Sequence, residues 1–126
     1  MSARSQIRTK AAERQRGAAD PQVSAWVSAN AGSGKTRVLI DRVARLLLAG
    51  ADPSRILCIT YTKAAAAEMS TRLFQRLGHW SMASDAELTQ ELRELGAEPP
   101  APEALDEARR LFARALETPG GLKIET

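Results

Sequence analysis

The residues with the clearest chemistry form one short run, Ala29–Thr36, which reads Ala-Asn-Ala-Gly-Ser-Gly-Lys-Thr. Gly32 and Gly34 allow positive φ and a close backbone approach, so successive N–H groups can line an anion-binding nest. Lys35 can reach the β- and γ-phosphates of a nucleotide, and the Thr36 hydroxyl can supply an oxygen ligand to Mg²⁺. The run therefore predicts a phosphate-binding (Walker A) loop for ATP or GTP, although its first position is alanine where the usual pattern has glycine.

The segments on either side of the loop are those that such a loop requires. Val23–Ser28 is rich in β-branched and aromatic residues and predicts a strand, whereas 36–48 has apolar residues at helical spacing. These apolar residues of the helix are Leu39, Val43, Leu46 and Leu47. The helix would also direct the positive end of its dipole at the phosphates. The alternative is a glycine-rich turn that only caps a helix.

Composition excludes several other classes of protein. The apolar share of 44% and the charged share of 26% are those of an ordinary globular domain. No apolar run approaches the roughly 20 residues of a membrane span, and no apolar segment follows the basic N-terminus as in a secretory signal. Cys58 is the only cysteine and lies in an apolar run, which indicates a core position. We therefore expect a cytoplasmic protein with no membrane partner.

Charge is unevenly distributed along the chain. Residues 1–45 have nine basic and three acidic side chains, a balance of +6, whereas residues 81–126 have five basic and ten acidic ones, a balance of −5. A basic leading segment is compatible with a polyanionic partner such as DNA or a nucleotide, but solvated helix faces have the same composition. Charge alone therefore decides nothing.

The pattern of the first half predicts alternating helices and strands. A polar helix from about Ser5 to Ala18 ends before Asp20-Pro21, because the residue before proline is disfavoured in a helix. After the loop helix stops at Gly50, the near-continuous apolar run 55–60 is typical of a strand buried on both faces. Together with Val23–Ser28 this predicts a right-handed βαβ unit with two parallel strands.

The second half is predicted to be mostly helical. A helix from about Lys63 to Gly78 would place Met69, Leu73 and Leu77 on one face. A capping box at Ser84-x-x-Glu87 begins a short helix, and a further helix starts near Pro102. The two apolar stripes are Leu88, Leu92 and Leu95 in the first, and Leu105, Ala108, Leu111, Phe112, Ala115 and Leu116 in the second. We interpret 81–118 as a helical insert, and 122–125 as the start of a third strand.

Three of these segments together carry a family resemblance. Gln15, Ala31–Arg37 and Thr60–Met69 resemble the Q motif, motif I and motif Ia of superfamily 1A (UvrD/Rep-type) DNA helicases, in the same order. Within that superfamily the text around the loop most resembles AddA-type helicase–nuclease proteins of bacterial double-strand-break repair. The resemblance implies an α/β fold, the N-terminal part (1–126) of a RecA-like P-loop ATP-binding domain with a parallel sheet, truncated here.

The resemblance also assigns roles to residues. Gln15 would hydrogen-bond the adenine edge and Arg37 would lie against the ring, although each could equally be a solvated surface residue. Thr60, Tyr61, Thr62 and Lys63 would contact single-stranded DNA, or Tyr61 could pack beneath the following helix. Lys63 and the alanine after it stand where the commoner text has Asn-Lys, so a phosphate contact is shifted by one residue. The residues assigned to nucleotide binding are Gln15, Ala29, Asn30, Ala31, Gly32, Ser33, Gly34, Lys35, Thr36 and Arg37.

The resemblance implies an ATP-dependent 3′-to-5′ DNA helicase, with a nuclease in the full-length protein, that acts in double-strand-break repair and recombination. Its cofactors would be ATP and Mg²⁺, and its partners would be single- and double-stranded DNA and a second, AddB-type subunit. Lys35 and Thr36 would take part in catalysis, but the acidic pair and arginines that complete hydrolysis would lie beyond Thr126. The alternatives are another P-loop enzyme, such as a small-molecule kinase, and a non-catalytic nucleotide- or DNA-binding module. Glu68 is expected on a helix surface, and His79 and Trp80 receive no role.

Overall fold

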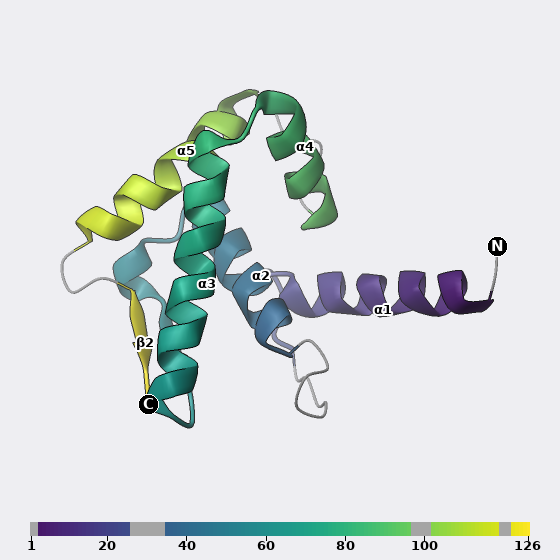
Figure 1. The fold of residues 1–126 in the computed structure, drawn as a ribbon, viewed down its shortest axis with the longest axis horizontal. Coiled ribbons are helices and arrows are strands. Elements are labelled where there is room, and N and C mark those ends of the chain that lie inside the picture. The colour runs from purple at the N-terminus through teal and green to yellow at the C-terminus, as the bar shows by residue number, and fades with distance from the viewer. Residues whose placement is uncertain (1–2, 26–34, 97–101, 119–121) are drawn as a thin grey trace.

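The structure is a computed structural model that describes residues 3–25, 35–96, 102–118 and 122–126. Helices dominate it, and two short strands complete the described part (Figure 1). In chain order the elements are α1 (Ala3–Ala19), α2 (Lys35–Leu48), the 3₁₀ turn η1 (Pro53–Arg55), β1 (Leu57–Ile59), α3 (Lys63–Met82), α4 (Asp85–Glu94), α5 (Pro102–Glu117) and β2 (Lys123–Glu125). The helices predicted from the sequence are therefore all present, and the predicted stop at Gly50 is confirmed by its φ of 97°.

The two strands form a parallel pair. Leu57 lies opposite Lys123, Cys58 opposite Ile124 and Ile59 opposite Glu125, and the Thr60 amide extends the ladder to the Glu125 carbonyl at 2.7 Å. Parallel neighbours need a long crossover, which α3, α4 and α5 provide. The strand predicted at 122–125 is thus confirmed, and it pairs with the apolar run 55–60.

The predicted strand Val23–Ser28 is not present in its described part. Residues 23–25 have no regular secondary structure, and residues 26–28 lie outside the described residues. The Val23 amide donates to the Asp20 carbonyl at 3.4 Å, and the Val23 carbonyl accepts from Arg42 at 2.6 Å. These contacts hold the segment in the turn that follows α1, so Val23 is not available to a sheet ladder.

A second expectation about the sheet was wrong. The run 55–60 was predicted to be buried on both faces, but only Cys58 is buried, whereas Leu57 is 57% exposed and Ile59 71% exposed. Side chains alternate across a strand, so Cys58 faces the helices while its neighbours face the opposite side. The described helices pack on one side of this sheet.

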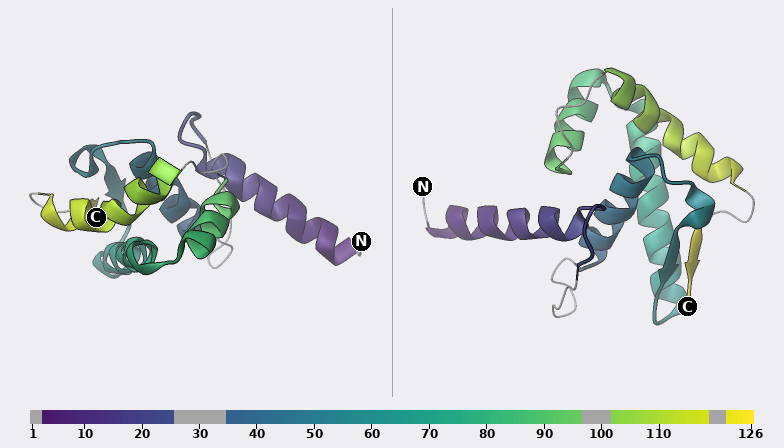
Figure 2. Two further views of the ribbon diagram at one scale, coloured as in Figure 1. Left: turned by 90° about the horizontal axis from the view of Figure 1, so that it is seen from above. Right: turned by 180° about the vertical axis from the view of Figure 1, so that it is seen from behind.

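The helix α3 is the centre of the core (Figure 2). Met69, Leu73 and Leu77 are buried as predicted, but the helix continues one turn past the expected end at Gly78 and buries Trp80. A Cβ at Gly78 would lie 3.5 Å from the Phe112 ring of α5. This glycine therefore serves close helix packing instead of ending the helix.

The segment interpreted as an insert packs into the same core. Ser84 caps α4 by accepting the Glu87 amide at 3.3 Å, as the capping box predicts. Arg109 of α5 donates to the Ala83 carbonyl at 3.1 Å and pairs with Asp85. Leu88, Leu92, Leu95, Ala108, Leu111 and Ala115 join one hydrophobic cluster with α2 and α3, Leu105 and Phe112 are half-buried against it, and Leu116 is exposed, contrary to prediction.

The helix α2 buries a different stripe from the one predicted. Val43 and Leu47 are buried as expected, but Leu39 is exposed and Leu46 is half-buried. Val38, Ile40 and Ala44 complete the buried face.

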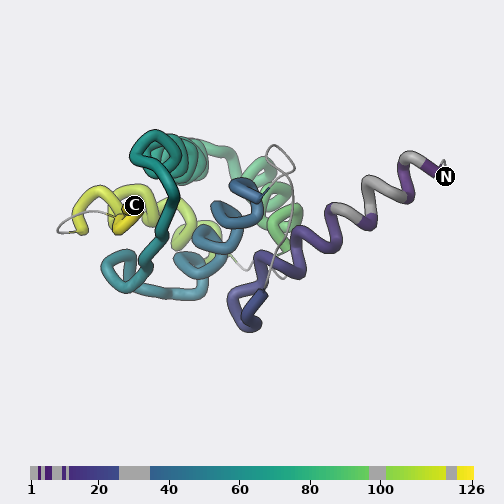
Figure 3. Tube along the Cα trace, turned by 90° about the horizontal axis from the view of Figure 1, so that it is seen from below, coloured from purple at the N-terminus to yellow at the C-terminus, as the bar shows by residue number. Residues whose placement is uncertain are grey.

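The polar helix α1 packs against α2 through its C-terminal part and projects away from the rest of the molecule toward its N-terminus (Figures 1 and 3). None of the helices in the described part is long and apolar enough to cross a membrane.

Candidate nucleotide-binding site

The predicted phosphate-binding loop leads into the N-terminus of α2. Ala29, Asn30, Ala31, Gly32, Ser33 and Gly34 lie outside the described residues, so their arrangement stays a prediction. Lys35, Thr36 and Arg37 form the first turn of α2 and are all exposed. The first turn of a helix presents unpaired N–H groups and the positive end of the dipole, so this end of α2 can attract an anion.

Gln15 and Arg37 are brought together although 21 residues separate them in the sequence. Both line one pocket of about 220 Å³, with Gln15 contributed by α1 and Arg37 by α2. Neither side chain makes a hydrogen bond or ion pair with another residue in the described part of the chain. A carboxamide and a planar guanidinium thus remain available in one hollow, next to the start of α2.

The helix α4 supplies a third wall, which sequence reasoning missed. Glu94 lines the same pocket, and its Oε1 accepts from Gln90 at 3.2 Å. A Cβ at Gly96, just after α4, would lie 3.5 Å from both Cδ of Arg16 and Nη1 of Arg45. The end of α4 therefore lies against α1 and α2, and the tertiary fold places Glu94 there.

The charges around the pocket are partly compensated. Asp41, one turn after Arg37, is paired with Arg76 of α3. A neighbouring hollow of about 340 Å³ shares Arg37, Asp41 and Glu94 with the first, and Trp80 and His79 line it as well. His79 Nε2 lies 2.8 Å from a Glu91 carboxylate oxygen, so this histidine links α3 to α4.

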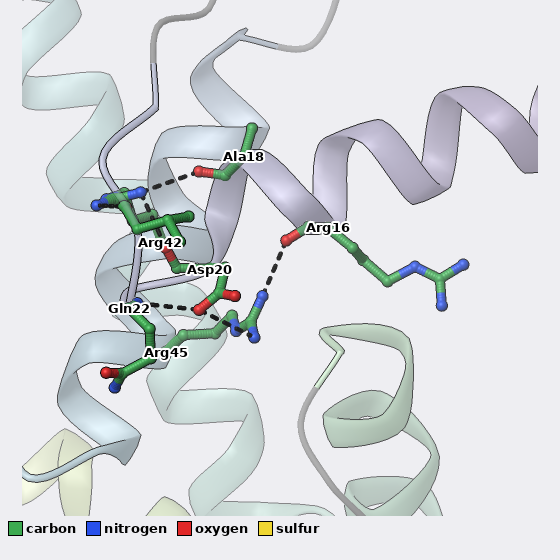
Figure 4. A network of polar contacts seen from close by, with 7 residues as sticks. Arg16, Ala18, Asp20, Gln22, Arg42 and Arg45 are labelled. Atoms are coloured by element: carbon green, nitrogen blue, oxygen red, sulfur yellow. Dashed lines mark hydrogen bonds and ion pairs between the residues drawn. The ribbon is translucent and has the colours of Figure 1, made fainter.

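Two arginines of α2 hold α1 in place, and no sequence motif marked them (Figure 4). Arg42 donates to the carbonyls of Ala18 at 3.1 Å, Asp20 at 3.0 Å and Val23 at 2.6 Å. Arg45 donates to the Arg16 carbonyl at 2.9 Å, and its other terminal nitrogen lies 4.0 Å from the Asp20 carboxylate. The signal that could have found them is their spacing of three residues, which places both on the face of α2 that meets α1.

The predicted DNA-contacting segment follows β1. Thr62 caps α3 by accepting the Ala65 amide at 3.1 Å, and the Thr60 hydroxyl donates to the Thr62 carbonyl at 3.0 Å. Tyr61 is fully exposed, so the alternative in which it packs beneath the helix was wrong. Lys63 is exposed as well and borders a hollow of about 470 Å³ with Ser70 and Glu125. Thr60 and Thr62 thus shape the turn, while Tyr61 and Lys63 reach solvent.

The first turns of α2 and α3 lie toward the same end of the molecule, the lower edge of Figure 1. Ligands of open α/β sheets bind outside the carboxyl ends of the strands, and β1 ends here. Away from this end, Glu68 pairs with Arg72 at 2.8 Å on the surface of α3, and Cys58 is buried, both as expected. Among the described residues, no group of three or more His, Cys, Asp or Glu side chains could hold a metal ion.

Comparison with known proteins identifies relatives of this arrangement. The model of the UvrD/REP helicase N-terminal domain matches residues 10–107. Proteins named as the AddA component of an ATP-dependent helicase/nuclease are similar to parts of the chain. The one from Lactobacillus gasseri is 55% identical over 51 residues, which is 40% of this chain and 4% of the relative, and the one from Oenococcus oeni is 42% identical over 74 residues, which is 59% of this chain and 6% of the relative.

The chain thus spans about 4 to 6% of the length of these curated relatives. No solved structure matches it. The family match includes Gln15, the predicted loop, the first turn of α2 and the segment after β1. The chain belongs to the UvrD/REP helicase N-terminal domain family.

Proposed function

We propose that this chain is the N-terminal part of an ATP-dependent DNA helicase and carries its ATP site. The observation that best supports the proposal is the pocket shared by Gln15 and Arg37, beside the first turn of α2. A carboxamide can both donate to and accept from a base edge, and a guanidinium plane can lie against an aromatic ring. The donor set therefore fits a nucleoside triphosphate whose base enters the pocket and whose phosphates lie at the loop.

In this assignment each residue has a distinct task. The backbone of residues 29–34 would surround the phosphates, and Lys35 would neutralise charge on the β- and γ-phosphates. The Thr36 hydroxyl would bind Mg²⁺, which stabilises the charge that develops during phosphoryl transfer. Gln15 would select adenine, because guanine presents a different pattern of donors and acceptors at the same edge. Arg37 would stack on the base.

The segment Thr60–Lys63 is proposed to bind single-stranded DNA. Tyr61 is fully exposed directly after β1, where a base could stack on its ring. Lys63, two residues later, could pair with a phosphate. Both lie at the same end of the molecule as the start of α2, so the nucleotide and DNA would bind close to one strand end.

The remaining features of the activity are proposed from the relatives, whose name describes part of an ATP-dependent helicase/nuclease. We assign to the full-length protein 3′-to-5′ unwinding, a nuclease, a cytoplasmic location, a role in double-strand-break repair and recombination, and an AddB-type partner. Hydrolysis would need an acidic pair for Mg²⁺ and further arginines. These groups are proposed to lie downstream of Thr126.

The test is Lys35→Ala, with Mg-ATP binding measured by titration calorimetry in the full-length protein. Loss of a charge-assisted contact of roughly 1.5 to 3 kcal/mol should weaken binding about tenfold to a hundredfold. Lys123→Ala is the matched control, because this lysine is exposed on β2, and its affinity should equal that of the wild type. Equal affinity for wild type and Lys35→Ala would overturn the phosphate-loop assignment.

A second experiment separates the helicase from other P-loop enzymes. ATP hydrolysis by the full-length protein should increase when single-stranded DNA is added, and Tyr61→Ala should reduce this stimulation. Hydrolysis that depends on a small-molecule acceptor and ignores DNA would favour a kinase instead. Nucleotide binding with no hydrolysis in the full-length protein would favour a non-catalytic module.

A further inference from the structure

The contact between α1 and α2 is mainly polar. Ala19 is buried at the end of α1, and of the helix's other described side chains none is buried. A helix that is polar on all sides gains little from hydrophobic packing, so other contacts must hold it. Arg42 and Arg45 provide them, since together they bind four backbone carbonyls at the C-terminal end of α1 and in the turn that follows it.

The chemistry of these contacts suits a clamp, by which we mean the pair Arg42 and Arg45. The last carbonyls of a helix have no intrahelical donor, and they carry the negative end of its dipole. A guanidinium offers five N–H donors in a rigid fork and keeps its charge at all physiological pH values. Arg42 uses two nitrogens on three carbonyls, of Ala18, Asp20 and Val23, at 2.6 to 3.1 Å.

The clamp fixes the two groups proposed to read the base. Gln15 directly precedes Arg16, whose carbonyl accepts from Arg45 at 2.9 Å. Arg37 lies on the same helix as the clamp, five residues before Arg42. The clamp therefore sets where Gln15 stands relative to Arg37, and Figure 4 shows both arginines directed at the end of α1.

We propose that Arg42 and Arg45 are positioning residues for base selection, which act on the nucleotide only through the placement of Gln15. The inference rests on the proposed function, because it assumes that Gln15 reads the base. A positioning residue of this kind is expected to affect the base without affecting the phosphates. Lys35 and Thr36 belong to α2 itself, whereas the clamp holds α1.

The experiment compares three probes by titration calorimetry in the full-length protein: Mg-ATP, Mg-GTP and magnesium tripolyphosphate, which has phosphates but no base. Arg42→Ala should weaken Mg-ATP binding about tenfold, bring it close to Mg-GTP, and leave tripolyphosphate unchanged. Gln15→Ala should give the same pattern. The double variant should lose no more than either single variant, because both changes remove one interaction.

Controls separate positioning from general damage. Arg72→Ala removes an arginine whose ion pair with Glu68 lies on the surface of α3, and it should leave all three affinities unchanged. Hydrogen exchange without nucleotide should be faster in α1 of Arg42→Ala and unchanged in α3. If Arg42→Ala does not fold, Arg45→Gln, which disturbs the contact to the Arg16 carbonyl, takes its place with the same expectations.

Three outcomes would overturn the inference. Tripolyphosphate binding that falls as much as Mg-ATP binding would mean that the arginines support α2 as a whole. An additive double variant, or Mg-ATP binding unaffected by Arg42→Ala, would mean that they do not act through Gln15. If Gln15→Ala alone has no effect, the proposed base contact fails, and with it the inference. Loss of tripolyphosphate binding in Lys35→Ala tests the phosphate loop separately.

Discussion

Trp80 offers the sharpest test of the core, because no sequence motif involves it and the structure buries it. Its side chain is 2% exposed and is the largest of the fully buried side chains in the described part. It belongs to the cluster that joins α2, α3, α4 and α5. Truncation to alanine removes this contact area and leaves a cavity that the surrounding helices fill only in part.

The expected cost of Trp80→Ala is about 3 to 5 kcal/mol, the range found for large aromatic side chains in cores. Domains of ordinary stability unfold with about 5 to 15 kcal/mol, so the variant should lose a third or more of its stability. With a urea dependence of about 2 kcal/mol per molar, a loss of about 4 kcal/mol lowers the unfolding midpoint by about 2 M.

Urea unfolding followed by far-UV circular dichroism measures this shift. Met82→Ala is the matched control, because Met82 lies two residues further along α3 and is 89% exposed. Its stability should stay within about 0.5 kcal/mol of wild type. A loss below about 1 kcal/mol for Trp80→Ala would refute the placement of Trp80 in the core, and equal losses in both variants would point to the end of α3 instead.

Three further predictions concern other parts of the chain. Gly50→Ala should destabilise by about 1 kcal/mol in thermal melts, since its φ is 97°, whereas Gly17→Ala inside α1 should stabilise by about 0.5 to 1 kcal/mol; neither site has an atom within 4 Å that would clash. Burial raises the pKa of the Cys58 thiol above its ordinary 9.0, so the folded chain retains a proton that the unfolded chain releases; stability should fall as pH rises above about 9, more steeply than in Cys58→Ala, and equal slopes would contradict this. In fluorescence anisotropy with labelled single-stranded DNA, Tyr61→Ala should lose about 1 to 3 kcal/mol that salt does not remove, whereas Lys63→Ala should flatten the salt dependence; unchanged binding in both would exclude this segment from the DNA site.

Local signals predicted the helices well because they act within a few residues. The proline after Asp20 and the positive φ at Gly50 end helices through backbone sterics alone. Ser84 caps α4 through a contact three residues away. None of these effects needs a distant partner, and each can be recognised in the sequence.

Expectations failed where a distant residue decides the outcome. Val23–Ser28 has strand composition, but the described part is held by Arg42, which lies 19 residues beyond Val23. Gly78 has the type of a helix end, but the ring of Phe112 packs over it and α3 continues. Composition and spacing contain no information about such partners, so neither correction could have been made from the sequence.

The candidate site shows the same division. The text around Lys35 indicates phosphate chemistry by itself, because residue types and spacing are sufficient for a glycine-rich loop. The pairing of Gln15 with Arg37 came from the family resemblance alone, and the pocket that they share depends on how α1 lies on α2. Glu94 could not be found at all, since it reaches the pocket only through the packing of α4.

The uneven charge of the chain has a more specific interpretation once the arginines are placed. Arg42 and Arg45 contribute to the balance of +6 in residues 1–45, but their guanidinium groups are directed at backbone carbonyls of α1 and its turn. Lys35 and Arg37 instead stand exposed in the first turn of α2, where the helix dipole adds to their charge. The count of basic residues therefore overstates the charge available to a bound anion, and these two side chains are the described ones that would supply it.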